Sequence, residues 1–197
     1  QLATGEYAAA LKTFDAATKR NATSIALRFI GREVYLHNNR PDLASQQLAT
    51  IQALAQSSPW RYSDAANRVR IGRTLLLTGA EPRQVLELLY DRATKERPDE
   101  LEPYVATAEL ALEKNDDAMA AKSLAKAVKL APADPHVHYL LARAHSSGDA
   151  RQATAALATA LELNPRHVPS LLFQIDDHLD AEDEDGAEAL IRQVLEV

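Results

Sequence analysis

Apolar residues along the chain follow one short pattern that recurs six times. In each instance a small or apolar residue is followed by apolar residues four and seven positions later, which places all three on one stripe of a helix. The pattern starts at residues 10, 44, 86, 120, 153 and 187, so the steps are 33 or 34 residues except for one of 42. The triplets are Ala10/Phe14/Ala17, Ala44/Leu48/Ile51, Leu86/Tyr90/Ala93, Ala120/Leu124/Ala127, Ala153/Leu157/Ala160 and Ala187/Ile191/Val194. This spacing predicts helices that stack as repeated units.

A second series of helical patterns lies between the first. Its third position is small in four of five members, which lets a neighbouring helix approach closely. The members are Leu27/Ile30/Gly31/Val34, Arg68/Ile71/Gly72/Leu75, Tyr104/Thr107/Ala108/Ala111, His138/Leu141/Ala142/His145 and Leu171/Gln174/Ile175/His178. Turn-forming residues separate the two series, and Pro41 and Pro82 suit the first turn of a helix, where a missing N–H costs nothing. Each unit is therefore expected to be an antiparallel helix pair, called here the first and the second helix.

The fold predicted from these patterns is all-α, a right-handed α-solenoid of antiparallel helix pairs with about five and a half repeats. The expected units are a half repeat at 2–21 and repeats at about 23–58, 62–98, 100–132, 134–165 and 167–197. Prolines at 98, 132 and 165 end three of the second helices. The partial first unit leads us to expect that this sequence is an excerpt of a longer array or protein.

The same residues resemble the tetratricopeptide repeat (TPR) family, whose pattern is W-x2-L-G-x2-Y, then A-x3-F, then P. Gly5–Tyr7 together with Ala10 and Phe14 match the second-helix half of the pattern, and Thr107–Ala108 and Leu141–Ala142 stand in for its Leu-Gly pair. The resemblance covers essentially the whole chain. It implies a stacked array in which the first helices line an inner, concave wall and the second helices form the outer wall.

The composition of the chain excludes several classes of function. The chain has no cysteine, which excludes disulfides, thiolate catalysis and zinc sites with cysteine ligands. Its net charge of −6 disfavours nucleic acid as a partner, and no apolar stretch is long enough for a membrane span.

Residues 1–98 hold 14 Lys/Arg and 9 Asp/Glu, whereas residues 99–197 hold 8 and 19. This asymmetry reflects either solvated faces or a polarised surface that orients a partner. A soluble protein is expected, with the cytoplasm and a periplasmic or secreted location both open.

The sequence offers no recognisable catalytic arrangement. HExxH, G-x-S-x-G and Walker-type glycine motifs are absent, so we expect neither an enzyme nor a bound cofactor or metal. The acidic run at 176–188 fails as a calcium loop, because Arg192 falls where a bidentate carboxylate is required. A hairpin turn followed by a first helical turn is the better interpretation. Trp60 lies in an insertion at 56–64, where we expect it to pack over a neighbouring hairpin, the alternative being exposed ligand binding.

In a TPR-like array the groove-facing residues follow from the position of the small residue on each first helix. The expected groove is basic toward the N-terminus and mixed apolar and acidic toward the C-terminus. Its residues are Arg28, Arg32, Val69, Arg70, Arg73, Val105, Glu109, Tyr139, Arg143, Leu172 and Asp176. An anionic segment is expected to bind nearest Arg28, Arg32, Arg70 and Arg73.

The leading functional hypothesis is a non-catalytic scaffold that binds a peptide or an extended segment of a partner protein in this groove. One alternative is the accessory arm of a larger enzyme, secreted or periplasmic. Another is a self-assembling structural element, since the last helix carries Leu190, Ile191, Val194 and Leu195 with no following helix to cover them. The sequence does not choose among the three.

Overall fold

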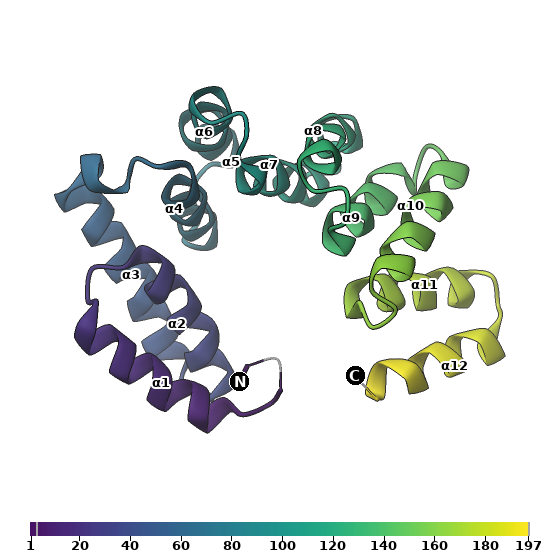
Figure 1. Cartoon of the computed structure of the whole chain (residues 1–197), viewed down its shortest axis with the longest axis horizontal. Coiled ribbons are helices and arrows are strands. Elements are labelled where there is room, and N and C mark those ends of the chain that lie inside the picture. The colour runs from purple at the N-terminus through teal and green to yellow at the C-terminus, as the bar shows by residue number, and fades with distance from the viewer. Residues whose placement is uncertain (3, 197) are drawn as a thin grey trace. The chain divides into compact units, whose positions relative to one another are not determined.

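The structure is a computed structural model that describes residues 1–2 and 4–196, and every regular element in them is helical (Figure 1). Ala3 and Val197, which fall in the expected half repeat and last repeat, lie outside the described residues. The chain divides into two compact units, Gln1–Pro98 and Asp99–Val197, called here unit 1 and unit 2. The fold class is the predicted one, an array of antiparallel helix pairs.

The helix bounds follow the predicted pattern. In unit 1 they are α1 (Tyr7–Arg20), α2 (Ile25–His37), α3 (Pro41–Ser57), the 3₁₀-helix η1 (Pro59–Tyr62), α4 (Ala65–Leu77), α5 (Pro82–Val85), the π-helical turn η2 (Leu86–Tyr90) and α6 (Asp91–Glu96). In unit 2 they are α7 (Leu101–Glu113), α8 (Asp117–Leu130), α9 (Pro135–His145), α10 (Ala150–Leu163), α11 (Val168–Asp180) and α12 (Glu184–Leu195). None of these helices is both long and apolar enough to cross a membrane.

Local chemistry sets the helix ends. Pro41 and Pro82 begin their helices, as predicted. Side chains cap several helices by accepting a backbone N–H of the first turn, as Asp64 does from Asn67 at 3.0 Å. Four first helices are followed by a residue with positive φ, which turns the chain back into a hairpin. These residues are Asn39 (54°), Gly79 (90°), Asn115 (56°) and Glu182 (58°).

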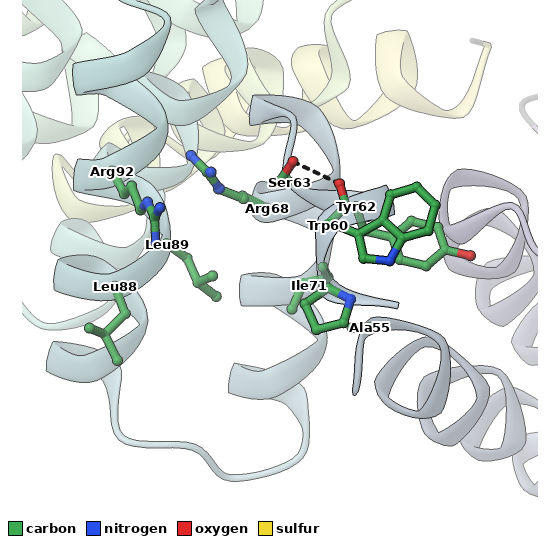
Figure 2. A pocket seen from close by; sticks show the side chains of 10 residues that line it. Ala55, Trp60, Tyr62, Ser63, Arg68, Ile71, Leu88, Leu89 and Arg92 are labelled. Atoms are coloured by element: carbon green, nitrogen blue, oxygen red, sulfur yellow. Dashed lines mark hydrogen bonds between the residues drawn. The ribbon is translucent and has the colours of Figure 1, made fainter. Parts of the chain in front are cut away.

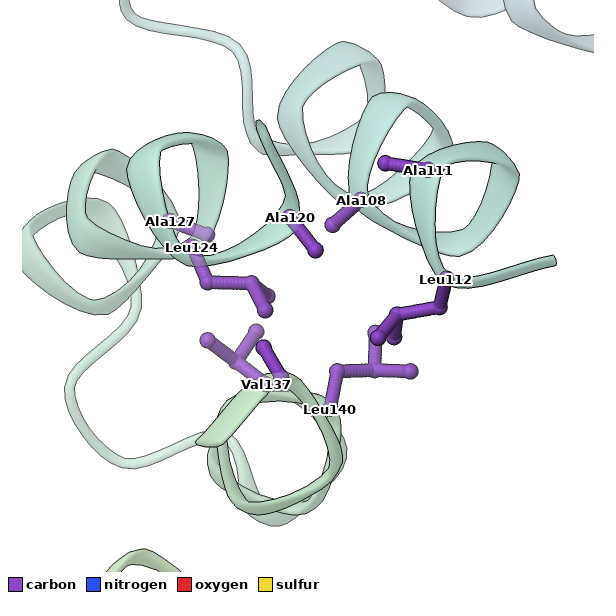
Figure 3. Close-up of a cluster of buried hydrophobic side chains, with 9 residues drawn as sticks. Ala108, Ala111, Leu112, Ala120, Leu124, Ala127, Val137 and Leu140 are labelled. Atoms are coloured by element: carbon purple, nitrogen blue, oxygen red, sulfur yellow. The ribbon is translucent and has the colours of Figure 1, made fainter. Parts of the chain in front are cut away.

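The largest core cluster lies in unit 2 and shows how the stack is held together (Figure 3). Leu124 of α8 points at Val137 and Leu140 of α9, while Ala108 and Leu112 of α7 close the other side. The second helix of one repeat thus packs against its own first helix and also against the first helix of the next. Burial of this kind stabilises neighbours pairwise rather than around one central core.

Glycines in unit 1 allow the close approach that the sequence predicts. A Cβ built on Gly72 of α4 would clash with the ring of Tyr90, whose exposed fraction is 1%. A Cβ on Gly31 of α2 would likewise overlap the ring of Phe14. The first contact lies within one repeat, while the second joins the half repeat of α1 to the next first helix.

Two expectations for the packing of unit 1 are wrong. Trp60 does not pack over a hairpin, because 79% of its surface is exposed. Tyr62, two residues later, fills that role: it is 6% exposed and its hydroxyl donates to the Thr23 carbonyl oxygen at 2.8 Å. The triplet Leu86/Tyr90/Ala93 is also wrong at its first member, because a π-helical turn at Leu86–Tyr90 puts Val85, which is 2% exposed, on the buried face and leaves Leu86 half-buried.

Candidate functional site

In unit 1 the first helices α2 and α4 pack side by side and carry the predicted arginines. Arg28 is held in place, with Nε and Nη2 donating to the Ala22 carbonyl oxygen at 3.2 and 3.1 Å and Nη1 to Gln47 Oε1 at 3.1 Å. Arg32 pairs with Glu33. A carboxylate ligand would therefore compete with existing partners of both arginines, which weakens this surface as an anion site.

The other unit 1 residues predicted for the groove differ in how far they are exposed to solvent. Val69 is completely buried, so the expectation that it faces a ligand is wrong. It points into the core because it lies on one stripe of α4 with Ala65, four residues before it, and Gly72, three residues after it, which are also buried. Arg70 and Arg73 are half-buried and interact with other groups of the chain.

In unit 2 the first helices α7, α9 and α11 form a wall with an aromatic cluster on it. Tyr139 of α9 is its centre, and we define the Tyr139 cluster as this residue with Glu109, His136, Arg143, His167 and Phe173. Ring centroids lie 5.7 Å from His136, 5.8 Å from His167 and 6.4 Å from Phe173. The guanidinium carbon of Arg143 lies 5.9 Å from the centre of the Tyr139 ring. All six side chains are half-buried, so part of each contacts solvent.

The ionisable side chains of the Tyr139 cluster contact one another. His136 Nε2 lies 3.5 Å from Glu109 Oε1, and the His136 and His167 rings are 5.9 Å apart. His167 Nδ1 also makes a 2.8 Å hydrogen bond with Ser170 Oγ. Burial lowers the pKa of His167 below its usual value, and the neighbouring His136 lowers it further. The cluster therefore favours a neutral His167 at neutral pH.

The other unit 2 positions predicted for the groove are spread around this cluster. Val105 of α7 is half-buried and packs against the core of Figure 3, whereas Leu172 (48% exposed) and Asp176 of α11 face solvent. Sequence reasoning found Glu109, Tyr139 and Arg143 but missed His136, His167 and Phe173. The position of His136, three residues before Tyr139 on the same helical face, was a signal that could have found it.

The acidic run adopts the predicted hairpin turn. Asp183 caps α12 by accepting the Gly186 N–H at 3.0 Å, and it also meets His178 Nδ1 at 2.8 Å. The Gly186 hydrogen bond, followed by His178, lowers the pKa of Asp183. Among the residues that the structure describes, no group of three or more His, Asp or Glu side chains is placed to hold a metal ion.

No family model and no curated protein matches the chain. Solved structures do resemble it. TTC0263, a thermophilic TPR protein of Thermus thermophilus, has a TM-score of 0.68 at 21% identity over 90% of this chain and 93% of its own. PilW, a type IV pilus biogenesis factor, gives 0.66 at 14% identity over 98% and 86%. YrrB, a TPR protein with an unusual peptide-binding site, gives 0.52 at 15% identity over 87% and 85%. This chain thus has the fold of the tetratricopeptide repeat proteins.

Proposed function

We propose that the chain is a non-catalytic scaffold that binds an extended segment of a partner protein on the first-helix wall of unit 2. The Tyr139 cluster carries the proposal. Three first helices bring two aromatic rings, two imidazoles, a guanidinium and a carboxylate together on a half-exposed surface. Aromatic and arginine side chains are the residue types that dominate binding energy at protein interfaces.

The cluster is suited to a ligand because its side chains are already held. Tyr139 touches His136, His167 and Phe173, so little rotamer freedom remains to be lost on binding. Apolar ring surface at the centre, with Arg143 and Glu109 beside it, provides contact area and two charges that orient a peptide. The peptide-binding site named for YrrB, which has the same fold, is consistent with this use of the scaffold.

The wall of unit 1 is the weaker alternative. Its arginines favour an acidic segment, and a carboxylate at Arg28 or Arg32 would gain a charge-assisted bond. That gain is reduced because Arg28 already donates three hydrogen bonds within the chain and Arg32 is paired with Glu33. We therefore assign the principal contact to unit 2.

A random dodecapeptide library, panned against the whole chain, tests the proposal. Peptides that survive are measured by calorimetry against the wild type and against the double variant Tyr139→Ala with Arg143→Ala. Removing both side chains should weaken binding at least about tenfold, as expected when central interface anchors are lost. Arg151→Ala, an exposed position on the second helix α10, serves as the control and should leave the affinity unchanged. If every peptide selected from the library binds the double variant as tightly as the wild type, the proposal is contradicted.

A further inference from the structure

A pocket of about 410 Å³ lies in unit 1 and is lined by none of the residues predicted for the groove. Leu88, Leu89 and Arg92 form one side of it, and Trp60 and Tyr62 form the other (Figure 2). Its volume falls in the range of ligand pockets and is large enough for a bulky apolar side chain.

The inserted residues build one side of this pocket. Tyr62 anchors the insertion through its buried ring and its hydrogen bond to Thr23. Trp60 is carried by the same 3₁₀ turn but remains 79% exposed, and the Ser63 hydroxyl bonds to its carbonyl oxygen at 2.9 Å. The insertion is therefore fastened to the fold while it presents a large aromatic surface that packs against little of the chain.

The opposite side is also irregular. Leu88 and Leu89 lie in the π-helical turn η2, a rare conformation that occurs frequently at functional sites. Leu88 is 66% exposed at the rim, while Leu89 is half-buried in the lining. The two departures from the repeat pattern, an insertion and a π turn, thus meet at one pocket.

The charge at the pocket is positive. Its described lining contains two arginines and no carboxylate. Arg68, 8% exposed, donates to Glu96 at 2.6 Å, and Arg92 Nε donates to the other oxygen of the same carboxylate at 2.9 Å. One carboxylate shared by two guanidinium groups leaves an excess of positive charge at the lining. An acidic ligand is complementary to this rim.

We propose that this pocket is a second docking site, which takes a bulky apolar side chain of an acidic protein segment between Trp60 and Leu88. A small molecule confined to the cavity would leave the exposed surfaces of Trp60 and Leu88 uncovered. A polypeptide covers the cavity and its rim together, and its carboxylates face Arg92. This site shares no residue with the Tyr139 cluster.

The same random dodecapeptide library is panned against the wild type and counter-selected against Leu88→Asp. This variant introduces a carboxylate at the rim, so it should both remove apolar contact and repel acidic peptides. Leu77→Asp is the matched control, since Leu77 is 49% exposed on α4 and does not line the pocket. Circular dichroism verifies that both variants are folded, and Trp60→Ala gives an independent test of the same rim.

The expected peptides contain a large apolar residue flanked by Asp or Glu. They should shift the emission of Trp60, the single tryptophan of the chain, to shorter wavelength and bind Leu88→Asp at least about tenfold more weakly. The absence of any peptide class sensitive to Leu88→Asp or Trp60→Ala would overturn the inference, as would enrichment of basic peptides. A dimer of the chain alone that Leu88→Asp abolishes would assign the pocket to a second copy instead and overturn it too. Peptides sensitive only to the Tyr139 variant would leave the proposed function standing without this site.

Discussion

Replacing Gly72 by alanine tests the helix packing of unit 1 most sharply, because two opposing effects can be estimated. Gly72 is buried in the interior of α4, where alanine favours the helix over glycine by about 1 kcal/mol. The new methyl group, however, would meet the Tyr90 ring, with Cζ and Oη at 3.0 Å and Cε1 closer still. Tyr90 is 1% exposed, so its ring cannot move aside into solvent. Overpacking of this kind costs about 1–3 kcal/mol, so the expected net loss of unfolding free energy is about 1 kcal/mol.

Urea unfolding followed by circular dichroism measures this loss as a lower midpoint at unchanged slope. Gly148→Ala is the control, because nothing lies within 4 Å of its Cβ position, and it should not destabilise the chain. In a Tyr90→Leu background the ring is absent, so Gly72→Ala should become neutral or stabilising. Stabilisation of the wild-type background by Gly72→Ala would refute the close packing of α4 against η2.

Three further perturbations probe other contacts. Tyr62→Phe removes the hydrogen bond to the Thr23 carbonyl and should cost about 1 kcal/mol of unfolding free energy, whereas the exposed Trp60→Ala should change it by less than about 0.5 kcal/mol, both read from urea midpoints. The fold lowers the pKa of His167, so the contribution of this residue to stability is present above the ordinary histidine pKa of 6.5 and is lost as the pH falls below it. His167→Gln should flatten this part of a curve of unfolding free energy against pH. An unchanged slope would contradict the lowered pKa. Self-association through α12 predicts a concentration-dependent dimer in sedimentation that Ile191→Glu abolishes, since Ile191 is 42% exposed; a monomer at every concentration would exclude it.

The repeat pattern predicts the helices and most of their buried faces. Tyr90 and Leu124, the central members of two triplets, are among the largest fully buried side chains, because the spacing of four and seven residues fixes one helical face. Proline at the first turn was equally informative, and Pro41 begins α3 as predicted. Local rules of this kind depend on few neighbours, so a single sequence suffices to apply them.

Features that depend on the width of a buried face or on irregular backbone were not predictable in the same way. Val69 is predicted to face the groove, yet it lies on the buried face of α4 with Ala65 and Gly72. Between Trp60 and Tyr62, composition gave no reason to choose which ring packs, and the hydrogen bond of Tyr62 to Thr23, 39 positions earlier, decides it. The π turn was likewise not predictable, and it shifts the buried face: Val85 is buried with Tyr90 five residues later, whereas Leu86 of the predicted triplet is only half-buried.

For the same reason the sequence indicates only part of the Tyr139 cluster. Tyr139 and Arg143 follow from their register on a first helix, but His167 and Phe173 join them only through the packing of α11 on α9. Contacts between repeats depend on side-chain conformations that the repeat period does not encode. The role of the basic residues of unit 1 in a groove stays a prediction, and their intramolecular partners, such as Gln47 for Arg28, do not follow from the repeat pattern.

Site-specific photo-crosslinking to a panned peptide tests the central claim most directly. A benzophenone amino acid replaces Tyr139 on the first-helix wall of unit 2 in one variant and the exposed Ala125 on the second helix α8 in another. If the wall binds an extended segment, irradiation should link the peptide to position 139 and not to position 125. Equal crosslinking at both positions, or crosslinking at 125 alone, would contradict the account.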